Sequence, residues 1–354
     1  MSNRIRKTLP TLLSLSSAFP PNAYPQQELY ETMGKNLYRD IPQLERISQR
    51  VRVKNRYLVL DPRVALAHDA PMGLGERMAL YERSVMEVGG RSIQGALETQ
   101  DRERIGSFIM ASSTGYVAPT PDVQLAQRFH LSPTLRHTFV GNMACNASLN
   151  VLNLALDSLA ARQNESVLIN CTEFSSLHAR DEADREQLVV HALFSDGSAS
   201  AVLGQEEEGV GPQFLGTYSM QLREAQDLMT WRLMDNGFRM TLSPTVPYLI
   251  RDNIEQFMNA LVTPAGLSVG DIKHWAIHPG GPKIVEVIGQ KFGLSDSQLR
   301  ATWHVLEEYG NCSSPTVLFV LEDMLAKDKP KPGEYGVMLG FGPGLTMEGA
   351  LMRF

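Results

Sequence analysis

The stretch GNMACNASLNVLNLALDSL, from Gly141 to Leu159, carries the strongest structural signal in this sequence of 354 residues. Its apolar side chains point in nearly every direction around a helical wheel, so the pattern predicts a helix buried on all sides. Such a helix belongs in the middle of a fold. Cys145 lies where the helix begins, and the helix dipole and unpaired N–H groups favour an anion there, so we expect a stabilised thiolate.

Two further polar residues end structured segments later in the chain. His278 in WAIHPGGPK (275–283) follows a predicted strand, and the glycines after it allow a ligand or another backbone to approach closely. Asn311 in EYGNCSSP (308–315) follows a predicted helix. Each candidate also has a structural interpretation, as a packed cysteine, a hydrogen-bonded core histidine or a turn-forming asparagine. None of the three establishes a site alone.

The composition is that of an ordinary globular protein, with 43% hydrophobic and 20% charged residues. A formal net charge of −6 argues against binding a nucleic-acid backbone or an anionic membrane. Cys145, Cys171 and Cys312 form no CxxC pair, which fits neither a disulfide framework nor a zinc ribbon. We therefore expect a reducing, cytoplasmic location, small-molecule or protein partners, and structural roles for Cys171 and Cys312.

Apolar runs alternate with helical patterns, as expected of an α/β architecture. No run reaches the roughly 18 to 20 apolar residues of a membrane span, and the apolar stretch near the N-terminus predicts a first strand rather than a signal peptide. The acidic, glycine-containing segment 204–211 predicts a boundary between two halves, residues 1–208 and 209–354. Strands are predicted over Thr11–Ser17, Ile105–Ala111, Ser166–Cys171, Ser198–Leu203, Trp275–His278, Thr316–Leu321 and Tyr335–Phe341. Helices are predicted over Gln27–Tyr38, Leu74–Glu98, Ala144–Arg162, Val246–Leu261, Pro282–Phe292 and Asp296–Tyr309.

The glycine-rich segment GFGPG at 340–344 is not a dinucleotide-binding fingerprint. The third glycine of GxGxxG would fall at Leu345, and a proline lies inside the turn. We interpret it as a tight turn that supports a neighbouring site.

Several segments together resemble the type III polyketide synthases, the chalcone synthase family. They are the Cys145 helix start, ALFSDGSASAVL (192–203), AIHPGGPK (276–283), EYGNCSSPTVLFVLE (308–322) and GFGPGLTMEGAL (340–351). Their order and spacing both match, from about residue 25 to the C-terminus. Within the family, VGNMACNASLNVLN (140–153), FRMTLSPTVPY (238–248), DIKHW (271–275) and PGEYGVML (332–339) resemble bacterial dihydroxyphenylacetyl-CoA synthases.

The resemblance implies a thiolase-like αβαβα fold of two similar halves, and a homodimer. It implies that Cys145 is a nucleophile with His278 and Asn311 beside it. Chemistry supports that set: the imidazole can hold a thiolate, and the imidazole and amide can donate to the enolate formed when malonyl-CoA loses carbon dioxide. No cofactor is expected beyond coenzyme A thioesters as substrates, and the starter arrives on coenzyme A or a carrier protein.

The resemblance also implies a set of cavity-lining residues. Phe194 matches a family gatekeeper phenylalanine, and the second gatekeeper falls at Met240. Trp231 lies near a position that is glycine in plant enzymes, and Ala118 replaces a methionine that crosses the dimer. Trp231 favours a small starter, whereas Met240 and Ala118 open room elsewhere, so the sequence leaves the cavity size open.

Four more residues are matched by position. Ser313 and Ser175 are expected to line the chamber. Arg46 and Arg50 match basic residues that hold the phosphates of coenzyme A, which suits bidentate donation by arginine. A solvated helix face is the alternative for the two arginines.

The expected function is iterative decarboxylative condensation of malonyl-CoA, followed by cyclisation to a resorcinol-type ring. One alternative is a long-chain alkylpyrone or alkylresorcinol synthase. Others are a ketoacyl-ACP synthase III-like enzyme that makes one condensation, a thiol hydrolase or acyltransferase with a similar Cys-His-Asn set, and an inactive homologue that serves as a dimer partner.

Overall fold

The protein is built around a nine-stranded sheet that runs through both halves of the chain. The computed structural model describes residues 8–42, 44–65, 72–180, 182, 184–235 and 237–354. The strand order is β11-β12-β13-β8-β1-β7-β6-β4-β5. The N-terminal strands are β1 (Leu9–Ala18), β4 (Ile105–Ser112), β5 (Arg136–Gly141), β6 (Ser166–Phe174) and β7 (Asp196–Glu206); the C-terminal strands are β8 (Gln213–Gln221), β11 (Ile272–Ile277), β12 (Tyr335–Gly342) and β13 (Thr346–Arg353).

The two halves of the sheet repeat one pairing pattern. In the N-terminal half β1 pairs antiparallel with β7, β7 antiparallel with β6, and β6 parallel with β4. In the C-terminal half β8, β13, β12 and β11 follow in the same order with the same directions. The halves meet where Thr11 pairs with Gln213. The fold therefore has the two similar halves that we expected, while the boundary at residue 208 remains a prediction.

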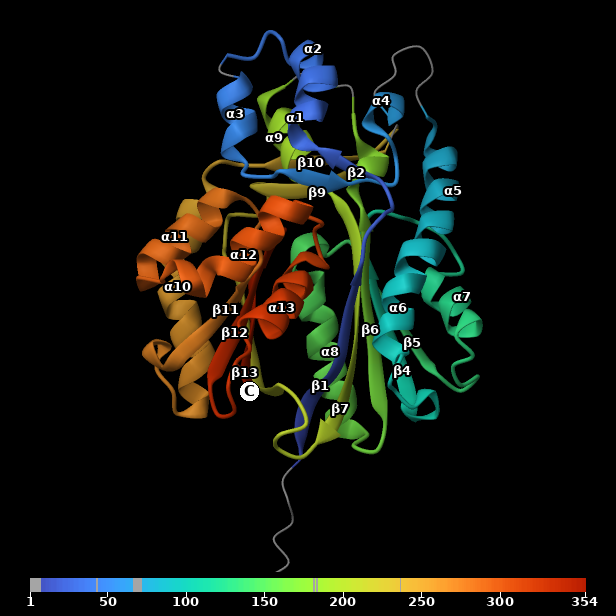
Figure 1. Ribbon diagram of the computed structural model, residues 1–354, viewed down its shortest axis with the longest axis vertical. Coiled ribbons are helices and arrows are strands. Elements are labelled where there is room, and N and C mark those ends of the chain that lie inside the picture. The colour runs from blue at the N-terminus through green and yellow to red at the C-terminus, as the bar shows by residue number, and fades with distance from the viewer. Residues whose placement is uncertain (1–7, 43, 66–71, 181, 183, 236) are drawn as a thin grey trace, which may run out of the picture.

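Helices cover both outer faces of the sheet and fill the space between its two halves (Figure 1). The N-terminal strands are covered by α5 (Leu74–Ser84), α6 (Gly90–Leu97) and α7 (Pro121–Arg128), and the C-terminal strands by α10 (Val246–Val262) and α11 (Pro282–Phe292). Two helices, α8 (Ala147–Ala161) and α13 (Thr316–Lys327), share the central core cluster, and α12 (Asp296–Tyr309) packs beside α13. This is the predicted αβαβα layering.

The prediction of a strand over Thr316–Leu321 is wrong, because these residues form the first half of α13. Every residue from Thr316 to Leu321 is buried. A segment buried on all sides shows no amphipathic period, so the β-branched Val317 and Val320 gave it the appearance of a core strand. The expectation that α8 is buried on all sides holds only for its first half, because Leu154, Asp157, Ala160 and Ala161 in the second half are exposed.

The remaining predicted elements are present, most of them with shifted ends, while the helices over 282–292 and 296–309 have the predicted bounds. The predicted helices 27–38 and 74–98 are each interrupted by a π-helical segment, at Tyr30–Gly34 and Val85–Gly89. The predicted strand over 275–278 ends at Ile277, so His278 lies just beyond β11. Within the described residues, no helix is both long and apolar enough to cross a membrane.

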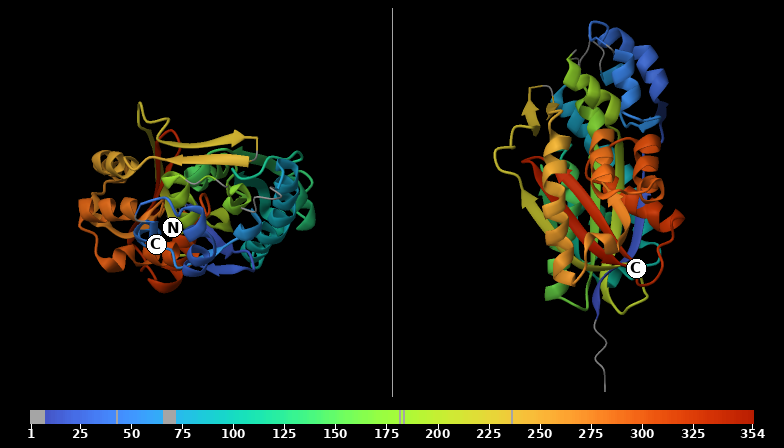
Figure 2. Two further views of the ribbon diagram at one scale, coloured as in Figure 1. Left: turned by 90° about the horizontal axis from the view of Figure 1, so that it is seen from above. Right: turned by 90° about the vertical axis from the view of Figure 1, so that its left-hand side faces the viewer.

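A cap of short elements lies over one end of the sheet, and a separate ribbon lies along one side of the molecule (Figures 1 and 2). The ribbon pairs β9 with β10. The sequence patterns predicted neither the ribbon nor most of the cap, because their segments are short and only partly apolar. The cap comprises β2 (Ala23–Pro25), α1 (Gln26–Leu29), α2 (Lys35–Leu37), α3 (Leu44–Arg50), β3 (Asn55–Tyr57), α4 (Pro62–Ala65) and α9 (Arg185–Leu193), and the ribbon comprises β9 (Met229–Met234) and β10 (Gly237–Leu242).

Candidate active site

Cys145, His278 and Asn311 line one small cavity although they are far apart in the sequence. Cys145 lies in the 3-10 turn Ala144–Asn146 that leads into α8. His278 follows β11, and Asn311 lies between α12 and α13. The cavity has a volume of about 20 Å³ and is also lined by Phe194, Trp231 and Met240. All three candidate reactive side chains are buried.

The backbone and side chain of Asn311 are held so that its amide nitrogen stays unpaired. The backbone N–H donates to the Leu193 carbonyl at 2.9 Å, and the carbonyl accepts from the Ser195 N–H at 2.9 Å. Oδ1 accepts from the Ser313 N–H at 2.8 Å, which fixes the orientation of the amide. Nδ2 has no partner among the described residues. The amide is therefore a preorganised donor.

The ring nitrogens of His278 also lack hydrogen-bond partners among the described residues. Its backbone N–H donates to the Leu339 carbonyl at 2.8 Å, but neither Nδ1 nor Nε2 has a hydrogen-bond partner in the part of the chain that the structure describes. Burial lowers the pKa of His278 to about 3. The resting imidazole is thus neutral, with one nitrogen free to donate and the other free to accept.

Cys145 rests as a thiol, which corrects the expectation of a stabilised thiolate. Burial raises its pKa to about 11, and the smaller opposing contribution of the Ser313 hydroxyl, 3.5 Å from the sulfur, does not offset this. The preceding Ala144 has a φ of 53°, a left-handed conformation that is strained for a residue other than glycine. Its N–H donates to Ser113 Oγ at 2.9 Å, which holds the turn in place.

The first turns of both central helices approach this cavity. Cys145 precedes α8, and Asn311 and Ser313 precede α13. The short distance of 3.5 Å between Ser313 Oγ and Cys145 Sγ shows that the two helix starts meet. Because the N-terminus of a helix carries a partial positive charge, negative charge that develops here during a reaction is stabilised from two directions.

Comparisons with known proteins agree over the whole chain. The family pattern of the chalcone and stilbene synthases matches with its N-terminal domain over residues 2–207 and with its C-terminal domain over residues 217–354. The chain belongs to the chalcone and stilbene synthase family. It is therefore a type III polyketide synthase, a condensing acyltransferase that forms carbon–carbon bonds.

Individual relatives have different named activities. "Alpha-pyrone synthesis polyketide synthase-like Pks18" of Mycobacterium tuberculosis is 32% identical, over 97% of this chain and 91% of the relative. "3,5-dihydroxyphenylacetyl-CoA synthase" of Amycolatopsis orientalis is 28% identical, over 96% and 92%.

Solved structures of the family confirm the thiolase-like fold. The 1,3,6,8-tetrahydroxynaphthalene synthase of Streptomyces coelicolor A3(2) superposes with a TM-score of 0.91 at 26% identity, over 97% of this chain and 99% of that one. PKS-I of the brown alga Ectocarpus siliculosus superposes with a TM-score of 0.90 at 27% identity, over 99% and 100%.

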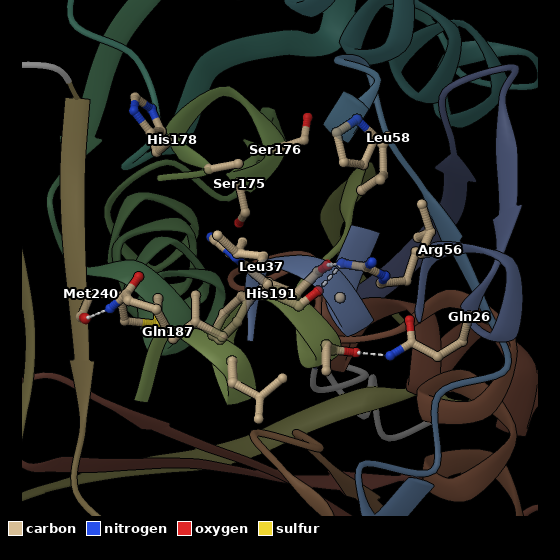
Figure 3. A pocket seen from close by; sticks show the side chains of 18 of the residues that line it. Gln26, Leu37, Arg56, Leu58, Ser175, Ser176, His178, Gln187, His191 and Met240 are labelled. Atoms are coloured by element: carbon tan, nitrogen blue, oxygen red, sulfur yellow. Dashed lines mark hydrogen bonds between the residues drawn. The ribbon is translucent and has the colours of Figure 1, made fainter. Parts of the chain in front are cut away.

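In this synthase, Phe194, Trp231 and Met240 form a wall shared by two cavities. The indole of Trp231 donates from Nε1 to the Ser113 carbonyl at 2.7 Å and stacks on Phe238 with ring centroids 5.2 Å apart. Beyond the wall lies a second cavity of about 90 Å³ (Figure 3).

Three residues assigned to the chamber do not line the cavity at Cys145. Ser313 is one of them, although its hydroxyl contacts the Cys145 sulfur. Ser175 lines the second cavity rather than the one at Cys145. Ala118 is exposed in the loop after β4 and lines neither cavity. Within this single chain, Ala118 therefore does not shape the chamber.

A large groove of about 900 Å³ opens next to the cavity at Cys145. Leu242, Gly280 and Ile284 line both the groove and the cavity. Three cationic side chains line the groove: Arg50 on α3, Arg185 on α9 and Lys283 on α11. Arg46 is exposed on the same helix as Arg50 but does not line the groove.

Sequence reasoning missed a buried carboxyl group close to the site. Glu173 accepts hydrogen bonds from the Ser113 N–H, from Thr114 Oγ1 and from Ser314 Oγ, each at 2.9 Å. It therefore ties the loop that holds the Cys145 turn to the start of α13. The available signal was a glutamate within a strand, β6, that is buried at all nine positions.

We expect Glu173→Gln to remove a pH dependence of stability. Burial raises the pKa of Glu173 to about 7, so the wild-type protein has full stability below the carboxyl's unfolded pKa and loses it as pH rises towards 7. Between pH 5.5 and 7.5 the wild type should lose about 2 kcal/mol relative to the variant. Urea unfolding at both pH values measures this, and an unchanged difference between the two proteins would contradict it.

Proposed function

We propose that the synthase condenses malonyl units onto an acyl group bound to Cys145 and cyclises the chain to a resorcinol-type aromatic product. One observation supports this proposal above all. The buried thiol of Cys145 lines the same cavity as His278 and Asn311, whose side-chain nitrogens have no hydrogen-bond partner among the described residues. Buried polar atoms without partners are costly, so a site that retains them is arranged for an absent ligand group.

In the loading step Cys145 attacks the carbonyl carbon of an acyl thioester. The thiol proton passes to an acceptor nitrogen of the His278 imidazole, a carbon–sulfur bond to Cys145 forms, and the bond to the coenzyme A sulfur breaks. The departing sulfur takes up the proton and leaves as a thiol. Because Cys145 and His278 are both neutral at rest, the proton moves from the thiol to the imidazole during the attack and not before the substrate binds.

In the extension step malonyl-CoA loses carbon dioxide, and the electron pair of the broken bond forms an enolate. An N–H of His278 and the Nδ2 group of Asn311 donate to its oxygen. The enolate carbon then attacks the Cys145 thioester, so a carbon–carbon bond forms and the Cys145 sulfur leaves. Donors fixed in advance stabilise such a developing oxyanion without reorganisation.

The position of Trp231 supports a small starter, such as a malonyl or acetyl group. Its indole belongs to the wall that separates the cavity at Cys145 from the second cavity. The second cavity beyond Trp231 is the observation that favours the alternative, a long-chain alkylpyrone or alkylresorcinol synthase, since a displaced indole would join the two spaces.

Incubation of the purified protein with malonyl-CoA alone, and then with added acyl-CoAs of increasing length, tests the proposal. We expect carbon dioxide release and an aromatic product from malonyl-CoA alone or with a short starter, identified by mass spectrometry. Pyrones formed only from medium or long acyl-CoAs would replace the proposal by its alternative. Dependence on a carrier protein would favour a starter delivered as acyl-ACP.

Replacing Trp231 by alanine should shift the starter preference towards longer chains. The truncation removes the indole between two cavities that already share Phe194 and Met240. We expect kcat/KM for hexanoyl-CoA to rise roughly tenfold relative to acetyl-CoA. Trp303→Ala is the matched control, because Trp303 lines neither cavity. An unchanged ratio in Trp231→Ala would mean that this side chain does not limit starter length.

Arg50→Ala should weaken the binding of coenzyme A thioesters. Arg50 lines the groove that adjoins the catalytic cavity, and loss of one charge-assisted phosphate contact costs about 1 to 2 kcal/mol. We expect KM for malonyl-CoA to rise roughly fivefold or more with little change in kcat. A malonyl N-acetylcysteamine thioester, which has no phosphate, should bind both proteins equally; a parallel loss with this substrate would exclude a phosphate contact.

We further propose a homodimer that works in the cytoplasm without a cofactor of its own. Support for the dimer comes from β5 at the edge of the sheet, because an uncovered edge strand invites pairing. Tyr116 in the loop that carries Ala118 is 84% exposed, which is unusual for a large aromatic side chain. Three free cysteines support a reducing location.

A further inference from the structure

The second cavity extends from the wall that includes Met240 to Gln26 and Arg56 of the cap (Figure 3). Most of its lining is apolar, with leucines from α1, α2, α9 and the segment after β3. Its volume of about 90 Å³ is several times the 10 to 15 Å³, roughly, that one water requires. Gln26, Arg56 and His191 lie at the cap end, and this end shares no residue with the cavity at Cys145.

Arg56 brings a positive charge into this cavity without a counter-ion. Arg56 is only 8% exposed. Its guanidinium forms no ion pair with any carboxylate of the described residues. Nη1 donates to the carbonyls of His191 and Phe194, while Nε has no partner. Burial lowers the pKa of Arg56 to about 10, which leaves it charged at neutral pH. Buried charges are normally paired, so this one lacks an anion.

The acid that acts on Arg56 electrostatically is already engaged. Asp196 accepts from the Ser176 N–H at 2.9 Å, from Ser176 Oγ at 2.5 Å and from the Val59 N–H at 2.8 Å. These three donors hold the carboxylate between β3 and the turn after β6. None of the hydrogen bonds that the Asp196 carboxylate accepts comes from Arg56, and Nε of Arg56 stays without a partner.

Gln26 adds a second unpaired atom next to Arg56. Tyr24 of β2 lies opposite Arg56 of β3, and Gln26 begins α1 directly after β2. Its Nε2 donates to the Ala192 carbonyl at 3.1 Å, whereas Oε1 is buried without a partner. The two side chains turn towards the cavity from the same wall (Figure 3).

We propose that the cap end of this cavity is a second small-molecule site, which binds a carboxylate with a short apolar body through Arg56. The carboxylate supplies the missing counter-ion, and the leucines cover the apolar part. The site does not depend on the proposed condensation reaction. Released polyketide acids and cellular fatty acids both combine a carboxylate with an apolar body. An aromatic acid as probe represents the first source, and an aliphatic acid represents the second.

Isothermal titration calorimetry on the Cys145→Ser protein tests the site without interference from acyl loading. Hexanoate and phenylacetate represent the aliphatic and aromatic sources, and hexanamide is the uncharged control. We expect at least one acid to bind, and hexanamide to bind roughly tenfold more weakly or worse, because it lacks the charge. Equal binding of hexanoate and hexanamide, or no heat with either acid at about 10 mM, overturns the proposal.

Three variants assign the binding to Arg56. Arg56→Gln should weaken carboxylate binding roughly tenfold or more. Since loss of a buried arginine can disturb folding, Gln26→Glu provides an independent test: its carboxylate pairs with Arg56, raises the melting temperature and excludes the ligand. Gln26→Met loses the same bond to Ala192 without adding charge, so it should bind within about threefold of the parent. Wild-type affinity in Gln26→Glu overturns the assignment.

Discussion

Cys145→Ala should abolish covalent acyl loading and reduce product formation by at least about 10⁴-fold, the scale of losing a catalytic nucleophile. The alanine side chain fits the buried turn, so the fold should survive. Release of carbon dioxide from malonyl-CoA should continue at a substantial rate, because the proposed donors for that step, His278 and Asn311, are unchanged. Mass spectrometry of the intact protein and trapping of carbon dioxide measure the two outcomes separately.

Cys171→Ala is the matched control for that experiment. Cys171 is also buried, but it lies within β6 and does not line the cavity. This variant should load acyl groups like the wild type. Acyl loading at wild-type level in Cys145→Ala would exclude the proposed role of Cys145, and loss of both steps together would point to a collapsed cavity instead.

Asn311→Asp should reduce decarboxylation by about 10² to 10³-fold while leaving acyl loading nearly intact. Aspartate keeps the oxygen that accepts from the Ser313 N–H and replaces Nδ2 by a second oxygen. In place of a donor, the enolate then meets an acceptor or a negative charge. At low pH the buried acid is protonated and can donate, so the defect should shrink as pH falls.

The same change at Asn259 controls for added charge, because Asn259 is exposed on α10, away from the cavity. Asn259→Asp should decarboxylate malonyl-CoA at the wild-type rate. Normal decarboxylation in Asn311→Asp would show that this amide does not stabilise the enolate. A pH-independent loss would instead indicate displacement of the Ser313 segment.

The sequence predicts the layered fold well where a segment has a clear period or a sharp end. The helices over 282–292 and 296–309 are present with the predicted bounds, because each has an amphipathic pattern and a glycine after its last residue. Thr316–Leu321 shows the limit. Inside a buried layer the environment is apolar on every side, so periodicity cannot separate a helix from a strand.

For the site, the motifs identify the residues that meet at the cavity but not their electrostatic state. Position at a helix start predicts a lowered pKa for Cys145, whereas the depth of burial, a property of the whole fold, raises it. Arg56 and Glu173 were missed because their significance depends on partners far along the chain. Likewise only the packed structure separates Ser175 from Ser313, whose hydroxyl contacts the Cys145 sulfur.

The repeat in strand order has a consequence for how activity arises. One repeat carries Cys145 ahead of α8, and the other carries Asn311 ahead of α13, so each supplies part of the candidate site and one of the two helix starts that meet there. The electric field at the sulfur is therefore a property of the docked pair. Neither repeat in isolation reproduces this field. We expect a shift of one half relative to the other at the Thr11–Gln213 pairing to weaken the field at the sulfur before either half unfolds.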